Sequence, residues 1–252
     1  MKILVLGSGT STGVPLIGCN CEVCTSNNPK NKRLRPSIFI QEDGVNCLID
    51  TTPDLRAQAL KYNILKIDLV LYTHTHADHL FGIDDLRMFN YIKKGPIPIY
   101  ASEKDINTIT TRFDYIFKKK TQSSKPDLIP NIIIDNKINF DNINIQAIPV
   151  FHGNQIINGY RIKDMAYLTD VSKIPDESLE LLRGVKVLMI DALRYTEHPT
   201  HLTVGDAIKI SNMLKSETTY LMHMGHKIEY EKLSADLPPN IVPSFDGLEF
   251  EI

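Results

Sequence analysis

The feature that most constrains the fold of this chain is a cluster of metal-ligand side chains at the end of an apolar segment. The aliphatic stretch 67–73 leads directly into the sequence HTHADH, which holds three of the eight histidines in 252 residues. Alternate side chains of a strand point to the same side, so we expect His74 and His76 to share one face. Asp78 and His79 would follow on the turn that opens the next helix. Imidazoles and carboxylates are ligands that zinc, manganese and iron prefer, and the pattern predicts a metal site.

Four neighbouring residues can hardly enclose two metal ions, so we expect further ligands from other strand ends. His152, Asp170 and His223 each follow an apolar, strand-like run, in the sequences PVFH, YLTD and YLMH. A shared cleft requires this kind of repeated placement. Taken singly, Asp170 could instead cap a helix, and either histidine could pack in the core or lie on the surface. Their common context favours all three as metal ligands.

Three of the four cysteines form a second cluster. Cys19, Cys21 and Cys24 have the spacing C-x-C-x-x-C, which can supply three thiolates to one tetrahedral zinc ion. The fourth ligand must come from elsewhere, and His226, three residues after His223, is the natural choice. Redox-active or merely neighbouring thiols are the alternative. Cys47 lies in an apolar segment and is predicted to be a small core residue.

Composition excludes some functions. The chain has 28 Lys and Arg against 30 Asp and Glu, so it offers no global attraction for nucleic acid or an anionic membrane. No stretch approaches the roughly 20 apolar residues that span a bilayer, and the first residues do not form a signal-peptide core. We therefore expect a cytoplasmic protein without a membrane partner. Its thiols should be reduced rather than paired in disulfides.

Periodicity predicts an α/β (α+β) protein, because strands and helices alternate through the chain. No repeat or low-complexity linker divides residues 1–252, which favours a single domain. Strands are expected at 2–6, 37–41, 46–50, 67–73, 97–101, 131–135, 138–140, 143–150, 185–192 and 218–223, with a hairpin at 159–170. Helices are expected at 53–62, 103–117 and 203–214, a polar loop at 118–131, and a last hairpin around the sequence FDG at 245–247.

The motif H-x-H-x-D-H resembles that of the metallo-beta-lactamase-fold hydrolases, and the resemblance covers nearly the whole chain. It implies an αβ/βα four-layer sandwich of two mixed β-sheets flanked by helices, with a dinuclear centre at one edge. A histidine at the third motif position, where di-iron relatives have glutamate, favours hydrolysis. The resemblance implies that the first metal takes His74, His76 and His152, that the second takes Asp78, His79 and His223, and that Asp170 bridges them.

The cysteine cluster resembles one branch of this superfamily, the PhnP-type cyclic phosphodiesterases, which carry an extra structural zinc. The resemblance implies a closed zinc site in a loop at about 18–26. A closed tetrahedral site has no open position for a substrate, so its role should be in folding. The ligands that the resemblance implies are Cys19, Cys21, Cys24 and His226.

The same resemblance implies a metal-dependent phosphodiesterase. Two divalent cations, zinc or manganese with iron as a further option, would hold a bridging hydroxide that opens a small cyclic phosphodiester. A ribose 1,2-cyclic phosphate and a 2',3'-cyclic nucleotide are the expected substrates. Asp78 and His201 are the predicted catalytic residues, since His201 precedes a helical stretch whose amino end favours anions. His198 is the other histidine that could contact the phosphate. Arg87 could bind phosphate or form a surface salt bridge.

Two other functions remain open. A tRNA 3'-processing endonuclease would grip tRNA with a basic, Gly/Pro-rich arm, and the nearest segment, 118–131, is short and of mixed charge. A nucleic-acid partner is therefore less favoured than a small phosphodiester. A non-catalytic, metal-stabilised scaffold is the second alternative, although a structural role does not need an open dinuclear centre. Family relatives are commonly dimers, which makes a homodimer one expected assembly.

Overall fold

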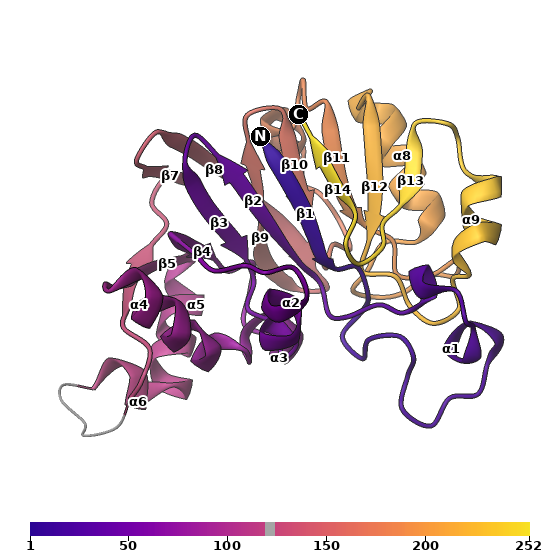
Figure 1. Cartoon of the computed structure of the whole chain (residues 1–252). Helices are drawn as coiled ribbons and strands as arrows, with labels where there is room; N and C mark the ends of the chain where they lie inside the picture. The colour runs from indigo at the N-terminus through magenta and orange to yellow at the C-terminus, as the bar shows by residue number, and fades with distance from the viewer. Residues whose placement is uncertain (119–123) are drawn as a thin grey trace.

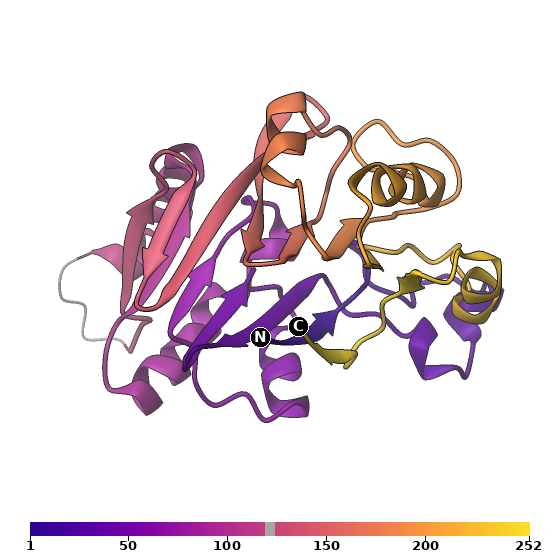
Figure 2. The same cartoon turned by 90° about the horizontal axis from the view of Figure 1, so that it is seen from above.

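Two β-sheets face each other in the computed structural model, which describes residues 1–118 and 124–252 (Figure 1, Figure 2). Within these residues each sheet has seven strands, in the orders β14-β1-β2-β3-β4-β5-β6 and β13-β12-β11-β10-β9-β8-β7. The first sheet contains β1 (Lys2–Gly7), β2 (Ser37–Glu42), β3 (Val45–Ile49), β4 (Leu69–Leu71), β5 (Ile97–Ala101), β6 (Leu128–Ile132) and β14 (Glu249–Glu251). The second contains β7 (Lys137–Phe140), β8 (Ile143–His152), β9 (Gln155–Ile162), β10 (Met165–Leu168), β11 (Val187–Asp191), β12 (Thr218–Met222) and β13 (Ile241–Pro243).

Helices cover the outer face of each sheet, so the molecule has four layers. Helices α2 (Leu55–Lys61), α3 (Ala77–Leu80), α4 (Leu86–Lys93), α5 (Glu103–Arg112) and α6 (Asp114–Phe117) pack on the first sheet. Helices α7 (Asp176–Leu181), α8 (Val204–Leu214) and α9 (Tyr230–Asp236) pack on the second. The short helices α1 (Glu22–Thr25), η1 (Pro29–Asn31) and η2 (Ile83–Asp85) complete the described elements. Among them, no helix is long and apolar enough to cross a membrane.

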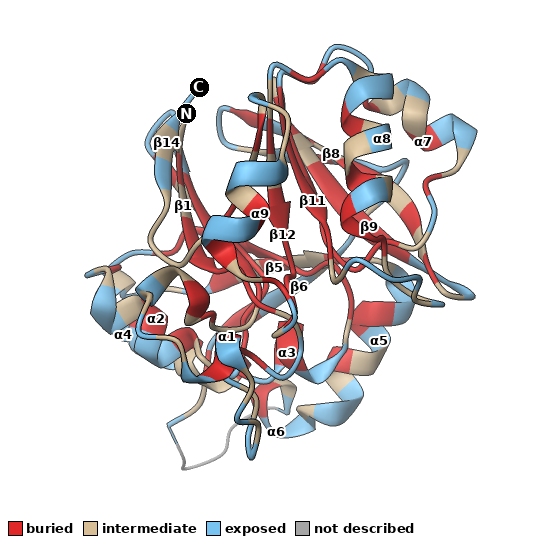
Figure 3. Cartoon of the chain, turned by 90° about the vertical axis from the view of Figure 1, so that its right-hand side faces the viewer, coloured by how far each residue is buried: buried red, intermediate tan, exposed pale blue. Residues whose placement is uncertain are grey.

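One core cluster lies between the sheets, and its apolar side chains come from both of them. Strands β1 to β4 supply one side and strands β7 to β12 the other, so alternate residues of these strands are buried inward. The remaining apolar residues of each sheet pack under the helices. Figure 3 shows buried strands behind helices whose outer faces are exposed. The predicted sandwich of two mixed sheets flanked by helices is confirmed.

Each sheet contains a run of parallel strands that fixes where a site can form. Strands β3 to β6 are parallel in the first sheet, and β10 to β13 are parallel in the second. Parallel strands end at the same edge of a sheet, and loops at their carboxyl ends are the usual place for ligand-binding residues. The loops after β4, β10 and β12 carry the histidines and aspartates that the sequence singles out.

Several predicted elements differ from the structure. The helix expected at 103–117 breaks at Phe113, where φ is −113° and ψ is 41°, into α5 and α6. The loop expected at 118–131 includes residues 119–123, which lie outside the described residues, and its end forms strand β6. Strand β6 is an edge strand, which tolerates Pro130 because no further strand needs its missing N–H. Strand β6 includes residues 131 and 132 of the strand expected at 131–135, and the other residues of that expected strand lie outside β6.

The hairpin expected around the sequence FDG is wrong, because this segment crosses from one sheet to the other. Strand β13 pairs with β12, whereas β14 pairs with β1. The buried carboxylate of Asp246 accepts hydrogen bonds from the amides of Ser8 and Leu34. Gly247 follows with φ +100°, a left-handed conformation that side chains rarely adopt. Long-range contacts therefore determine a crossover that looks locally like a turn. Helices α7 and α9 also have no counterpart among the predicted elements.

Gly82 gives a test of how tightly α3 is seated. A Cβ added at Gly82 would lie 2.1 Å from the carbonyl oxygen of Thr52, although the backbone there has an ordinary φ of −87°. We expect Gly82→Ala to lower the free energy of unfolding by about 1–3 kcal/mol, since backbone must move. Gly205→Ala is the matched control, because a Cβ added at Gly205, in the first turn of α8, would make only an ordinary contact, 3.7 Å from Oγ1 of Thr203. It should raise stability by about 0.5–1 kcal/mol. Equal denaturant midpoints for the two variants would contradict this packing argument.

Candidate metal centre

The predicted ligands meet where the strands of both sheets end. His74 and His76 lie in the loop after β4, which ends at Leu71, so their expected placement on one face of a strand is wrong. Asp78 and His79 belong to α3, the short helix that follows. The remaining three predicted ligands, His152, Asp170 and His223, come at the ends of β8, β10 and β12.

The backbone turns sharply at these strand ends. Asp170 and His223 both have φ of +58°, and Asp50, just after β3, has φ of +66°. Residues other than glycine rarely adopt this left-handed conformation, and such strained residues gather at functional sites. Here the turn redirects each side chain from the sheet to the edge that the two sheets share. The three aspartate and histidine side chains are all buried.

The structure brings the seven side chains into two groups that share Asp170. In each group the ligand atoms lie within 4.8 Å of one another. Oδ1 of Asp170 lies 3.1 Å from Nε2 of His79 and 3.2 Å from Nε2 of His223, and its Oδ2 lies 3.8 Å from Nε2 of His74. One group is His74, His76, His152 and Asp170, and the other is Asp78, His79, Asp170 and His223. A carboxylate with one oxygen toward each group can bridge two cations.

Unpartnered polar atoms show that this cluster fits metal ions. Burying a polar atom without a hydrogen-bond partner is unfavourable, so such atoms are rare. Here several gather at one point among the described residues, and they face one another rather than any donor or acceptor with good geometry. They are Nε2 of His74, His79 and His223, and Oδ2 of Asp78. The carboxylates at this centre have ion-pair contacts only with histidines within the described chain, so cations would satisfy both charge and coordination.

Burial and charge shift the pKa values within the cluster in opposite directions. Burial, helped by the charge of His79, holds the pKa of His74 well below its usual range, which keeps this imidazole neutral. Burial would also lower the pKa of His223, but the carboxylates of Asp170 and Asp78 outweigh it and raise the pKa to about 9. Metal binding requires neutral imidazoles, so cations that enter here would displace these protons.

Neighbouring groups hold the ligand rings in place. Nδ1 of His79 lies 2.7 Å from Oδ2 of Asp50, which also accepts from the hydroxyl of Thr73. Nδ1 of His152 donates to the carbonyl oxygen of Thr200 at 2.9 Å. A ligand imidazole whose other nitrogen is tied to an acceptor has a fixed tautomer and orientation. This leaves Nε2 of each ring free for a metal.

The sequence analysis missed two carboxylates of this centre, Asp50 and Asp191. Both end apolar strands, in the sequences CLID and LMID, which is the same context that singled out Asp170 in YLTD. Applied evenly, the strand-end criterion finds all three. The strand-end criterion cannot show that Asp50 and Asp191 contact histidines and do not lie beside Asp170.

His201 forms a pair with Asp191 beside the cluster. Its Nδ1 lies 2.8 Å from Oδ2 of Asp191, a carboxylate that is fully buried at the end of β11. Its ring stacks on that of His223 at 4.7 Å and meets the ring of His152 edge-on at 4.9 Å. The free Nε2 of His201 therefore belongs to a ring packed between ligands of both groups. This is the arrangement of an oriented proton donor or acceptor.

His198 lies in the same loop but is bound differently. Its Nδ1 accepts from the backbone amide of Thr200 at 3.3 Å, which places the proton of the neutral ring on Nε2, and the hydroxyl of Thr200 lies 3.1 Å from the same Nδ1. Its ring centre lies 5.1 Å from that of His201. Arg87, the other residue considered for phosphate, lies on the exposed face of α4 and forms an ion pair with Asp84 at 3.5 Å. The structure gives Arg87 the surface salt bridge.

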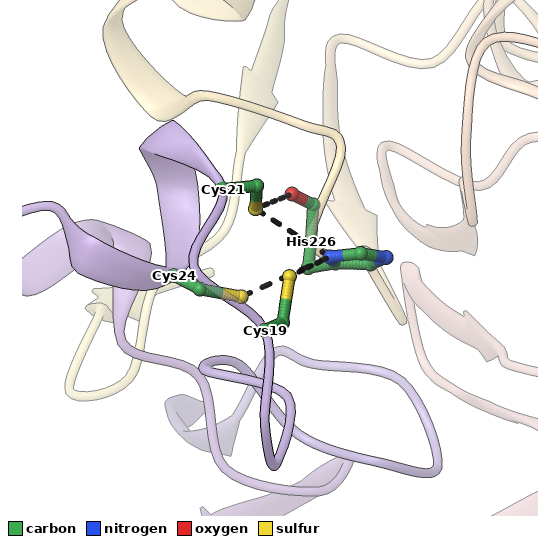
Figure 4. Close-up of side chains that lie close together, drawn as sticks. All are labelled: Cys19, Cys21, Cys24 and His226. Carbon is green, nitrogen blue, oxygen red and sulfur yellow. Dashed lines mark hydrogen bonds between the residues drawn. The ribbon is translucent and has the colours of Figure 1, made fainter.

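The three cysteines of the second cluster lie together with His226, and the four side chains point toward one another (Figure 4). Nδ1 of His226 lies 3.3, 3.6 and 3.8 Å from the sulfur atoms of Cys19, Cys21 and Cys24. A tetrahedral zinc with ordinary bond lengths would hold sulfur and nitrogen roughly 3.5 Å apart. The backbone amide of Cys24 lowers the pKa of Cys21 to about 6, which favours a thiolate. The four side chains therefore fit one closed zinc site.

A short turn joins the two clusters. His223 and His226 are three residues apart, and the residues between them are fixed on both sides. The amide of Met224 donates to the carbonyl oxygen of Ser8, and the amide of Gly225 donates to that of Leu193. The buried guanidinium of Arg33 donates to the carbonyl oxygens of Gly225 and Ile228. The amino-terminal loop and the turn that carries His223 are thus held as one unit.

Known proteins share this architecture. Residues 45–224 match the Beta-lactamase superfamily domain. The crystal structure of a diphosphatase from the PhnP family has a TM-score of 0.93 and 44% identity, covering 100% of this chain and 97% of its own. An octanoyltransferase of Porphyromonas gingivalis is 38% identical over 99% of this chain and 51% of its own length, so the chain spans about half of that relative. A ribonuclease Z of Saccharolobus solfataricus is 26% identical over 89% of this chain and 71% of its own length.

The domain match covers most of the chain and includes both the histidine motif and the strand ends that supply the other ligands. The full-length likeness to the PhnP-family protein extends it to the amino-terminal loop with the cysteine cluster. The chain thus belongs to the metallo-beta-lactamase superfamily and is related to a PhnP-family diphosphatase.

Proposed function

We propose that this protein is a dinuclear metal-dependent hydrolase of phosphodiesters, with a small cyclic phosphodiester as substrate. The observation that carries the proposal is the pair of ligand groups that share Asp170, one oxygen of which approaches His79 and His223 and the other His74. Two cations held by these two groups would form a clamp suited to the attacking and leaving oxygens of a phosphoryl group.

The residues divide the work between holding cations and handling protons. His74, His76 and His152 would hold one cation, Asp78, His79 and His223 the other, and Asp170 would contact both. When bound, zinc or manganese supplies Lewis-acid activation of water and neutralises the charge of the phosphate. Asp50 and the carbonyl oxygen of Thr200 keep the ligand rings oriented toward the cations.

His201 is suited to deliver a proton to the departing oxygen. Asp191 accepts from Nδ1 of His201, and Nε2 can then donate a proton when the imidazole carries a proton on both nitrogens. The same carboxylate also accepts from the amide of Val171 at 2.9 Å, so its position is fixed on two sides. An imidazole held in this way can donate to an alkoxide as the phosphorus–oxygen bond breaks.

A second candidate is hydrolysis of a phosphoanhydride, the P–O–P bond of a diphosphate diester. The structural relative that is described as a diphosphatase favours it, because its likeness covers the full chain at 44% identity. Both substrates present a phosphoryl group with two esterified oxygens to the same two cations. They differ in the leaving group, since a phosphate leaves more easily than an alkoxide and depends less on a proton from His201.

Three other activities are less well supported by these residues. The matched region is about half of the octanoyltransferase relative. The polar clusters of this chain are suited to metals rather than acyl transfer. Because one relative is a ribonuclease Z, cleavage of tRNA precursors is an alternative activity for this chain. A non-catalytic scaffold would not account for a buried group of unpartnered ligand atoms.

Asp170→Asn tests the proposal on a panel of substrates. We expect the unaltered protein to open 2',3'-cyclic AMP or ribose 1,2-cyclic phosphate. The panel also contains NAD, which tests hydrolysis of a diphosphate, and a tRNA precursor, which tests the endonuclease alternative. The variant should lose on the order of 10²- to 10⁴-fold in kcat, because one carboxylate contacts both groups. Asp164→Asn, on the exposed turn before β10, is the matched control and should keep full activity. Efficient precursor cleavage with inert cyclic phosphates would support the endonuclease instead, and unchanged hydrolysis by Asp170→Asn would exclude this site.

His201→Ala separates proton transfer from metal binding. We expect kcat for 2',3'-cyclic AMP to fall on the order of 10²- to 10⁴-fold, with the metal content unchanged. The loss should be much smaller for bis(p-nitrophenyl) phosphate, whose leaving group needs no proton. Asp191→Asn should lower kcat about 10- to 100-fold, as expected for an orienting group. Loss of metal from His201→Ala would show instead that Asp191, His201 and His223 form a ligand set, since their ligand atoms also lie close together.

Cys24→Ser tests the proposed structural zinc. Metal analysis of the purified protein should find one zinc equivalent fewer in this variant, together with a lower thermal midpoint, because the loop loses its tie to His226. Cys47→Ala is the control, since Cys47 is a buried thiol in β3 away from the cluster. It should keep the full zinc content. Equal zinc content in the two variants would rule out the site.

A further inference from the structure

A groove leads away from the metal centre between helices α7 and α8, and no role has yet been assigned to it. Figure 3 shows these two helices next to each other on the outer side of the second sheet. The groove has a volume of about 470 Å³, within the range of roughly 300–1,000 Å³ that small-molecule sites occupy. One end is lined by His201 and His198, and the far end by Met213.

The metal end of the groove is continuous with the catalytic residues. Ser172 lines it two residues after Asp170, and the hydroxyl of Ser172 donates to the carbonyl oxygen of Phe151 and accepts from the amide of Gly153. His152 lies between these two partners in sequence. A substrate whose phosphate lies at the two ligand groups would therefore extend past His201 into this groove.

The groove has an apolar floor and a charged rim. Ile174 and Leu202 are buried in the floor, and Leu179 and Ile210 are half-buried beside them. Met213 lines the groove and remains 62% exposed. The rim carries charges of both signs, from Lys173, Glu197, Asp206 and Lys209. Lys173 forms no ion pair with any described residue.

This combination favours a flat ring with polar edges over other occupants. A bare sugar is covered with hydroxyl groups and would leave the apolar floor without a partner. An acyl chain would fill the floor but would leave the charged rim facing methylene groups. A nucleobase offers an apolar face for the floor and hydrogen-bonding edges for the rim. The imidazole of His198, at the end of the groove, provides an aromatic surface on which a base can stack.

We propose that the α7–α8 groove binds the base of a nucleotide substrate. The proposal rests on the phosphodiesterase function proposed above and narrows it, because it favours a nucleoside phosphodiester over a sugar phosphate without a base. It also gives His198 a role distinct from that of His201. His198 contacts the base, whereas His201 serves the reacting phosphate.

A pair of substrates isolates the contribution of the base. Adenosine 2',3'-cyclic phosphate and methyl riboside 2,3-cyclic phosphate have the same cyclic phosphodiester, but only the first has a base. We expect a preference of about tenfold or more in kcat/KM for the adenosine compound, since stacking of one base contributes on this scale. Ile210→Asp and Met213→Asp should each bring this ratio close to one. Met213 is mostly exposed, so its variant should fold even if Ile210→Asp does not.

Two further variants serve as controls. Met88→Asp places the same charge on an exposed methionine of α4, 56% exposed and outside the groove, and should keep the preference. His198→Phe retains a planar ring and should also keep it, whereas His198→Ala should lower it. A residue that transferred protons would show the reverse, with phenylalanine no better than alanine.

Binding of adenosine gives a readout that does not depend on turnover. Saturation-transfer NMR should show contact between the protein and the base protons, lost in Met213→Asp and kept in Met88→Asp. Equal kcat/KM for the two substrates, or a preference unchanged in both groove variants, would overturn the proposal while leaving the phosphodiesterase function intact. Binding of octanoate in place of adenosine would also overturn it. If neither substrate is hydrolysed, the proposed function fails, and the NMR comparison alone decides whether the groove binds a base.

Discussion

The structure depends on buried carboxylates whose ion-pair partners within the described chain are all histidines. Asp50, Asp78, Asp170 and Asp191 are all buried at one edge of the sandwich, and no lysine or arginine of the described chain forms an ion pair with any of them. Burying an uncompensated charge is very unfavourable, so the folded chain is suited to hold cations at this edge. This requirement unites the architecture, the ligand positions and the proposed chemistry.

The sheets provide rigid positions for these charged groups. Each ligand or orienting carboxylate follows a strand of the core, and the strands are fixed by the apolar cluster between the sheets. The left-handed conformations of Asp50, Asp170 and His223 store strain that packed strands on both sides can sustain. Ligands placed in this way keep their geometry without a bound substrate. Such preorganisation is what a site for phosphoryl chemistry needs.

The metal centre, the cysteine site and the groove are formed by neighbouring segments, and each has a different proposed role. The turn from His223 to His226 joins the open centre to the closed cysteine site, so the amino-terminal loop is fixed against the same turn. On the other side, the loop with His198 and His201 lines the groove beside the centre. The superfamily hosts many reactions on one fold, and the segments around the centre decide which substrate it accepts.

The sequence by itself determined the candidate ligands and the fold class, because both are local signals. The motif around His74 and His79, the strand-end positions of Asp170 and His223, and the cysteine spacing are legible without a structure. So is the alternation of strands and helices. These features depend on residue type and short-range spacing, which the chain displays directly.

Only the tertiary structure decided which of these residues meet. In the structure, His74 and His76 lie in a loop rather than on a strand. The segment around Asp246 crosses from one sheet to the other, and Asp50 and Asp191 contact histidines. The tertiary structure also gave His201 a carboxylate and His198 a groove, a distinction that two histidines three residues apart do not reveal. Contacts between distant segments depend on how the sheets pack and where loops cross, and no local pattern encodes them.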